Sequence, residues 1–297
     1  MEIHSGGTCP MRIFHQIAEY RQWRATIRTP LVFVPTMGAL HEGHASLITH
    51  ARRVAGPDGA VAASIFVNPM QFGAGEDFSR YPRTVKEDEA LLAARSTDVL
   101  FLPDANVMYP SGAETVKVTP GPLAGMLEGA DRPGHFEGVC TVVAKLLNII
   151  TPTHMILGQK DFQQHVLLAK MIRDLDFPVN LIVAPTVREP DGLAMSSRNR
   201  YLTPEQRRLA PIIYRTLCWA VQAARSGDRD ADELAAEIRH RIDTGGLETR
   251  YAVICNAKTL LPPRGRVSKE DVILVAAKLG TTRLIDNMLI NEEPSHG

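Results

Sequence analysis

The first two-thirds of the chain alternates between short apolar segments and longer stretches with a helical pattern. The short segments are mostly apolar, and they are 31–34, 60–67, 98–102, 154–157 and 179–184. Several of them end at or close to a proline. The helical stretches between them are 42–55, 83–95, 139–150 and 161–175. Strands that are apolar on both faces are typical of a parallel sheet covered by helices on its two sides. The alternation therefore predicts a Rossmann-like, doubly wound α/β domain over residues 1–185, which binds ligands beyond the carboxyl ends of its strands.

The pattern changes after Pro185. Two helical stretches are followed by three closely spaced strand-like ones: 204–226 and 230–243, then 250–255, 272–277 and 282–289. Helices and strands that are grouped in this way are typical of an α+β arrangement. The sequence therefore predicts a domain boundary near Thr186 and a smaller α+β lid domain over residues 186–297.

Composition excludes several classes of partner. The 33 basic and 33 acidic side chains cancel, so there is no overall charge for nucleic acid or an anionic membrane to attract. No apolar run approaches the ~18 residues of a spanning helix, and the first 14 residues lack the apolar stretch of a secretory signal. The four cysteines have no C-x-x-C spacing, which argues against a disulfide framework and a zinc site: Cys9, Cys140, Cys218 and Cys255. We expect a cytoplasmic protein with reduced thiols.

The segment Pro35–His44 (PTMGALHEGH) connects the first predicted strand to the helix that opens near Glu42. Unpaired N–H groups at a helix start favour phosphate oxygens. His41 and His44 are three residues apart, so they share a face of the helix start and can point at the same phosphates. Imidazole can donate hydrogen bonds to the charge that develops on leaving pyrophosphate. Taken alone, the pair could equally be a surface coincidence or half of a metal site.

A second motif, Met195–Asn199 (MSSRN), follows Gly192. Glycine and small polar residues suit a mobile loop, and the guanidinium of Arg198 offers fork-shaped donors to a triphosphate. A solvated Ser/Arg turn is the plainer interpretation of this segment by itself.

Together, the H-x-G-H sequence and the later basic, serine-rich loop resemble the HIGH and KMSKS motifs of the nucleotidyltransferase superfamily. Further motifs stand in the order and spacing of the pantothenate synthetase (pantoate–β-alanine ligase) family: Phe66–Phe72 (FVNPMQF), Tyr81–Thr84 (YPRT), Arg132–Phe136 (RPGHF), Gly158–Gln164 (GQKDFQQ) and Met195–Asn199. The resemblance covers roughly residues 11 to 290.

This resemblance implies an ATP-dependent ligase that activates pantoate as an acyl-adenylate and transfers it to β-alanine, with release of AMP and pyrophosphate. It also implies Mg²⁺ and a homodimer, with small-molecule substrates as the other partners. Some family members place an acidic magnesium contact in the region of Glu87 and Asp88. A solvated acidic helix face is an equally good interpretation of these two residues, so no protein ligand is assigned to the metal.

The resemblance also implies the roles of individual residues. The ATP contacts would be Met37, Gly38, Ala39, Leu40, His41, Glu42, Gly43, His44, Gly158, Gln159, Lys160, Asp161, Val187, Met195, Ser196, Ser197 and Arg198. Four of these would be catalytic: His44 as proton donor toward the leaving phosphate, with His41, Lys160 and Arg198. Gln71 and Gln164 would bind pantoate, with Gln71 also near β-alanine, because a side-chain amide offers both a donor and an acceptor.

Plainer interpretations stay open for several of these residues. Asn68 and Gln71 could cap a strand end, Lys160 and Asp161 could be a helix-start pair, and Val187 could be ordinary core. The chain also departs from the family pattern at three positions that carry no catalytic role: Gln159 where glutamate is common, Phe162 where tyrosine is frequent, and Glu137 where arginine or another residue stands. A nucleotidyltransferase whose product keeps the nucleotide, and a nucleotide-sensing binding module, are the rival functions.

Overall fold

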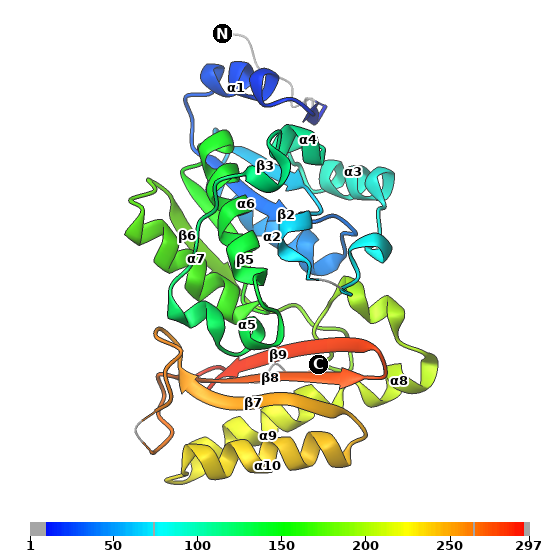
Figure 1. Cartoon of the computed structure of the whole chain (residues 1–297), viewed down its shortest axis with the longest axis vertical. Helices are drawn as coiled ribbons and strands as arrows, with labels where there is room; N and C mark the ends of the chain where they lie inside the picture. Colours follow the sequence, from blue (N-terminus) through cyan, green and yellow to red (C-terminus); the bar gives the residue numbers. More distant parts are fainter. Residues whose placement is uncertain (1–9, 74, 264, 294–297) are drawn as a thin grey trace. The chain divides into compact units, whose positions relative to one another are not determined.

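A computed structural model describes residues 10–73, 75–263 and 265–293, and the chain divides into two compact units (Figure 1). Unit 1 consists of Met1–Gly121, Arg132–Leu157 and Leu168–Ala184; unit 2 consists of Pro122–Asp131, Gly158–Leu167 and Pro185–Gly297. The last change of unit falls next to the boundary predicted near Thr186. Unit 2 also contains two earlier segments, 122–131 and 158–167, which the sequence pattern places in the first domain.

Unit 1 is built on a six-stranded sheet in the order β1-β4-β3-β2-β5-β6. Its strands are β1 (Arg12–Phe14), β2 (Leu31–Thr36), β3 (Ala60–Ile65), β4 (Val99–Phe101), β5 (His154–Gly158) and β6 (Asn180–Ala184). The chain moves outward from β2 through β3 to β4 and then returns to the other side of β2 with β5. The order therefore reverses between β2 and β5, where doubly wound sheets bind their ligands. The predicted Rossmann-like fold is confirmed.

Helices connect the strands of unit 1: α1 (Ile17–Thr26), α2 (Glu42–Ala55), α3 (Val85–Ala94), α4 (Ala105–Met108), α6 (His135–Ile150) and α7 (Phe162–Asp174). The first part of α7 belongs to unit 2 and the rest to unit 1. All six residues of β3 are buried, because side chains on both of its faces pack against neighbouring elements. Ala45, Ile48 and Ala51 line the buried side of α2, where Ile48 and Ala51 pack with Val32 and Val34 of β2 in one core.

Unit 2 contains an antiparallel sheet of β7 (Glu248–Asn256), β8 (Asp271–Leu279) and β9 (Thr282–Leu289), in that order. Helices α9 (Ile212–Ser226) and α10 (Ala231–Thr244) cover one face of this sheet through alternate residues of β8 such as Ile273 and Val275 (Figure 1). The residues that alternate with them, such as Val272 and Leu274, pack on the other face. The sheet thus has two apolar faces, and each face must be covered.

The two early segments supply the second cover. Leu123, Leu127, Phe162 and Val166 pack with Val272 and Leu274 in a separate core. Short helix α5 (Glu128–Asp131) is tied to the sheet by Arg283 of β9, whose guanidinium contacts both acidic ends of that helix. Tyr251 of β7 donates to Glu128 at 2.8 Å. The α+β character predicted for the C-terminal part is confirmed, and its sheet is completed by residues from earlier in the chain.

One predicted element is wrong. The stretch 204–226 forms two helices, α8 (Pro204–Leu209) and α9, rather than one. Pro211 separates them, because it has no N–H to donate to the carbonyl of Arg207 and its ring would clash with that carbonyl in a continuous helix. Of the four cysteines, Cys9 lies outside the described residues, and Cys140, Cys218 and Cys255 are free thiols. No helix in the described part of the chain is long and apolar enough to cross a membrane.

Candidate active site

The backbone of the loop after β2 is hydrogen-bonded to a buried carboxylate of α3, that of Asp88. Asp88 is only 2% exposed and accepts the backbone N–H groups of Ala39 (2.9 Å) and Leu40 (2.8 Å), together with the hydroxyl of Thr84 (3.1 Å). Gly38 and Ala39 both have positive φ, and a Cβ at Gly38 would lie 3.0 Å from the Asp88 carboxylate. The loop therefore needs glycine at position 38 and an acceptor at position 88. Asp88 does not lie on a solvated helix face, although neighbouring Glu87 is exposed.

His41 and His44 cap the start of α2 reciprocally. The Nδ1 atom of His41 accepts the N–H of Gly43 (3.1 Å), and that of His44 accepts the N–H of His41 (3.4 Å). The expectation that the N–H groups of this helix start are unpaired is therefore wrong for these two. Since each Nδ1 is an acceptor, a neutral imidazole in this arrangement carries its proton on Nε2. The rings lie side by side, with centroids 4.2 Å apart.

The side chain of Gln71 lies within unit 1 near the same loop. It donates to the sulfur of Met37 (3.1 Å) and accepts from the amide of Asn68 (3.0 Å). Asn68 caps the short 3₁₀ turn Pro69–Gln71, since its Oδ1 accepts the N–H of Met70. Gln71 lies within that turn and makes no cap. The structure thus brings Gln71 next to one predicted ATP-loop residue, Met37.

The motif Arg132–Phe136 has a structural task that the sequence did not reveal. The carbonyl of Gln71 contacts Nδ1 of His135 (2.9 Å) and a guanidinium nitrogen of Arg132 (3.4 Å). Arg132 is fixed in turn by two 2.7 Å bonds to Glu76. Burial alone raises the pKa of Glu76, but the Arg132 guanidinium outweighs this, and the pKa is lowered. These contacts set the backbone position of Gln71.

The turn after β5 carries Lys160 and Asp161 immediately before α7. Their side chains pair weakly, with 3.4 Å between Nζ and Oδ2, and both remain partly exposed. The carbonyls of Gln159 and Lys160 accept from Asn287 of β9, and the Gln159 side chain donates to Glu292 at 2.8 Å. A glutamate in place of Gln159 would bring its carboxylate next to that of Glu292, and the two negative charges would repel each other.

Gln163 and Gln164 are neighbours in sequence with different environments. Gln163 is buried and holds the first early segment of unit 2 through the carbonyls of Leu123 and Met126. Gln164 is half-buried, and none of the described residues hydrogen-bonds its side-chain amide. Burial lowers the pKa of the next residue, His165, to about 4, so that its imidazole is uncharged at neutral pH. Because none of the described residues hydrogen-bonds the side-chain amide of Gln164, that amide keeps its hydrogen-bonding capacity for a ligand.

The segment before the serine pair forms a small hairpin rather than an open loop. Met195 N–H donates to Val187 carbonyl at 3.0 Å, so the two predicted adenine contacts are adjacent. Ser196 caps the 3₁₀ turn Ser197–Tyr201 by accepting the N–H of Arg198 at 3.3 Å. Gly192, which suggested mobility, is required by packing: its φ is +90° and a Cβ there would lie 2.0 Å from the ring of Tyr214.

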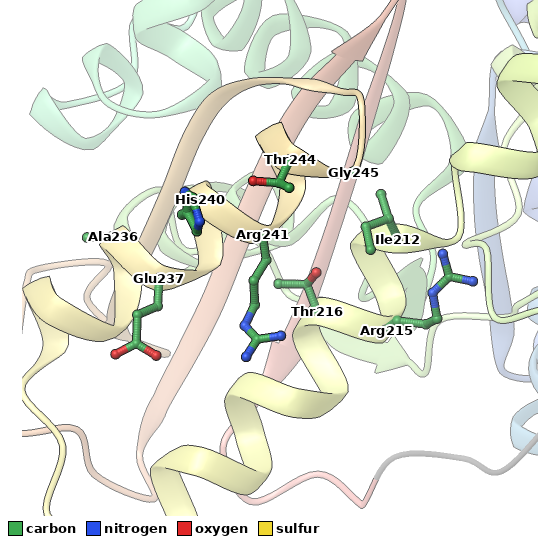
Figure 2. Close-up of a pocket in the computed structure, with 9 residues that line it drawn as sticks. All are labelled: Ile212, Arg215, Thr216, Ala236, Glu237, His240, Arg241, Thr244 and Gly245. Atoms are coloured by element: carbon green, nitrogen blue, oxygen red, sulfur yellow. The ribbon is translucent and has the colours of Figure 1, made fainter.

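The other two departures from the family pattern are structural. Phe162 packs in the core between α7 and the three-stranded sheet. Glu137 pairs at 2.8 Å with Lys117 on the surface of unit 1. Among the described residues no group of three or more His, Cys, Asp or Glu side chains could hold a metal ion. An open groove of about 840 Å³ lies between α9 and α10 and contains none of the predicted site residues (Figure 2).

The sheet order defines a doubly wound α/β protein. The histidine pair follows β2 and the lysine turn follows β5, the two strands between which the order reverses. The family described as pantoate-beta-alanine ligase matches residues 12–289. Pantothenate synthetase of Chloroflexus aurantiacus is 47% identical, over 95% of this chain and 99% of that protein, and the Roseiflexus castenholzii enzyme is 48% identical, over 94% and 99%.

Solved structures agree. Pantothenate synthetase from Thermus thermophilus superimposes with a TM-score of 0.84 at 43% identity, over 94% of this chain and 99% of that one. The pantoate-beta-alanine ligase from Francisella tularensis, complexed with beta-gamma ATP and beta-alanine, gives 0.80 at 36% identity, over 96% and 100%. The chain belongs to the pantoate–β-alanine ligase family, a family of acid–amine ligases.

Proposed function

We propose that the chain condenses (R)-pantoate with β-alanine in two steps that consume ATP. In the first step a pantoate carboxylate oxygen attacks the α-phosphorus, the bond to the β-phosphate breaks, and pyrophosphate leaves. In the second, the β-alanine amine attacks the acyl carbon of pantoyl-adenylate, AMP leaves, and the amine loses a proton. Adenylation is needed because a free carboxylate would have to expel oxide.

The arrangement of His41 and His44 carries this proposal. Their Nδ1 atoms are occupied by backbone N–H groups, which leaves Nε2 as the protonated nitrogen of each neutral ring. Two donors at the start of α2 can stabilise charge that develops on leaving pyrophosphate. Positioning and charge neutralisation are the main contributions to phosphoryl-type transfer. The family membership of the chain and the ATP complex of the Francisella relative support ATP as a substrate.

The remaining predicted residues complete the proposal. Lys160 and Arg198 neutralise phosphate charge, and Val187 and Met195 contact adenine. The rest of the ATP set is Met37, Gly38, Ala39, Leu40, Glu42, Gly43, Gly158, Gln159, Asp161, Ser196 and Ser197. The N–H groups of Ala39 and Leu40 are already bound to Asp88, so these two residues would contact ATP through other atoms. Gln71 and Gln164 bind pantoate, with Gln71 also near β-alanine.

Magnesium enters this scheme with the nucleotide. Mg²⁺ commonly keeps several waters and is held by substrate phosphates with few protein ligands. That mode fits the described residues, which offer no carboxylate or histidine cluster. Bound there, Mg²⁺ would neutralise triphosphate charge. We further propose a cytoplasmic homodimer, as is typical of the family.

The test is incubation with ATP, Mg²⁺, pantoate and β-alanine, followed by separation of the nucleotides and detection of pantothenate. We expect AMP and pyrophosphate in equal amounts, with pantothenate formed only when all substrates are present. Pyrophosphate without AMP would favour a nucleotidyltransferase that leaves the nucleotide on its product. Saturable ATP binding without turnover would favour a nucleotide sensor.

Replacing Gln164 with alanine should weaken pantoate binding by about 1–3 kcal/mol, because a substrate hydroxyl loses its partner. The KM for ATP should barely change. The measurement is initial-rate kinetics with each substrate varied in turn, with exposed Gln222 of α9 replaced by alanine as the control. A Gln164→Ala variant that loses ATP affinity as much as pantoate affinity would contradict the assignment.

A further inference from the structure

Two consecutive residues of β9, Asp286 and Asn287, are polar and almost completely buried, at 4% and 1% exposure. Strand β9 lies at an edge of the three-stranded sheet, where Asp286 is opposite Val275 and Asn287 is opposite Leu274. Consecutive strand residues point to opposite faces, so the two side chains serve different surroundings. Buried polar side chains persist where they are hydrogen-bonded, and both of these are.

Asp286 holds the hairpin that contains Val187 and Met195. Its carboxylate pairs with Arg188 through two bonds, of 2.6 and 3.0 Å. The same guanidinium donates to the carbonyl of Gly192 at 3.1 Å and stacks 4.3 Å from the Tyr214 ring. One buried ion pair thus fixes both the start of the hairpin and its tip.

Asn287 holds the turn that contains Lys160. Its Nδ2 donates to the carbonyls of Gln159 (3.1 Å) and Lys160 (2.9 Å), and its Oδ1 accepts from the Gln159 side chain (3.3 Å). A single side-chain amide therefore satisfies two turn carbonyls and one side chain. These hydrogen bonds restrict the backbone conformation at Lys160.

We propose that Asp286 and Asn287 are positioning residues for nucleotide binding, which hold the adenine hairpin and the lysine turn in their binding conformations. This inference rests on the proposed function of those two segments. Neither residue needs to touch ATP: Asp286 acts through Arg188, and Asn287 acts through the carbonyls of Gln159 and Lys160.

Asn287→Asp tests the second half of the proposal. Aspartate has almost the same shape, but it has no N–H to donate and sets a carboxylate against two carbonyls. Because small misplacement of a binding group costs up to ~10²-fold, we expect the KM for ATP to rise about 10- to 100-fold. The KM for β-alanine should not change. A merely structural role would lower the melting temperature and leave the ATP-to-β-alanine ratio of KM values as in the wild type.

Asn256→Asp is the matched control, since Asn256 lies on the same sheet and its Oδ1 accepts the N–H groups of Lys258 and Thr259. Aspartate keeps that acceptor, so its ATP kinetics should match the wild type. Asp286→Asn tests the first half of the proposal, because it keeps one acceptor for Arg188 and removes the charge, and it remains available if Asn287→Asp does not fold. Its expected result is likewise a selective rise in the KM for ATP.

The wild-type enzyme is assayed first, with ATP, Mg²⁺, pantoate and β-alanine. Absence of AMP and pantothenate in that assay would overturn the proposed function. If the wild type is active and a folded Asn287→Asp or Asp286→Asn variant keeps the wild-type KM for ATP, the positioning inference alone is overturned.

Discussion

His44→Ala should lower kcat for pantoyl-adenylate formation by about 10²–10⁴-fold, the usual contribution of a positioned proton donor. The donor is Nε2, because Nδ1 accepts the N–H of His41. The measurement is pyrophosphate release with ATP and pantoate alone, in single-turnover mode, so that the later capture of the adenylate by β-alanine does not contribute. A near wild-type rate would remove His44 from the catalytic set.

Because His44 also caps α2, two further variants separate its roles. Asparagine keeps an acceptor near the Nδ1 position and has nothing at Nε2, whereas glutamine extends an amide toward Nε2. If donation matters, His44→Gln recovers part of the rate and His44→Asn does not. If only capping matters, the order reverses. His50→Ala, on the same helix, is the control for loss of an imidazole that has no assigned role.

Asp88→Asn should lower kcat/KM for ATP by about 10²-fold, because a misplaced loop loses the geometry on which positioning depends. The side-chain amide of asparagine has only one oxygen that can accept. One of the two N–H groups, of Ala39 or of Leu40, would therefore face the NH₂ group of the new asparagine. An unsatisfied buried donor costs about 1–3 kcal/mol, and we expect the melting temperature to fall as well. Steady-state kinetics and thermal unfolding on the same preparation provide both numbers.

Asp98→Asn is the matched control for this effect. Asp98 also accepts a backbone N–H, that of Val61 at 2.7 Å, and pairs with Arg52, but it precedes β4 rather than facing the loop after β2. Its amide variant should lose stability while it keeps the ATP kinetics of the wild type. Equal kinetic losses in the two variants would mean that Asp88 acts through general stability.

The fold was largely predictable because its strands are apolar on both faces. The predicted helix 42–55 and strand 282–289 coincide with α2 and β9. Strand β1 and helix α1 were not predicted: the strand has three residues, and the buried residue of α1, Tyr20, is a single apolar anchor in a polar helix. These elements depend on tertiary packing more than on a local pattern.

The candidate site was predictable only where family motifs name residues directly. The roles of Asp88, Arg132 and His135 depend on contacts between segments far apart in sequence, and no periodicity reports such contacts. The local argument about unpaired helix N–H groups failed at His41 for a related reason, since the side chain three residues later supplies the acceptor. The assigned ATP and pantoate contacts remain predictions.

The two-sided burial of β8 has a consequence for how the polypeptide can be divided. A fragment cut at Thr186 would leave Val272, Leu274 and Cys255 without the residues that cover them, which come from the segments 122–131 and 158–167. Contacts such as that between Glu128 and Arg283 join residues 155 positions apart, so they form only after long stretches of chain have closed. We therefore expect that the C-terminal part does not fold on its own, and that during synthesis the segments 122–131 and 158–167 remain without their partner until the sheet, which is made last, has left the ribosome.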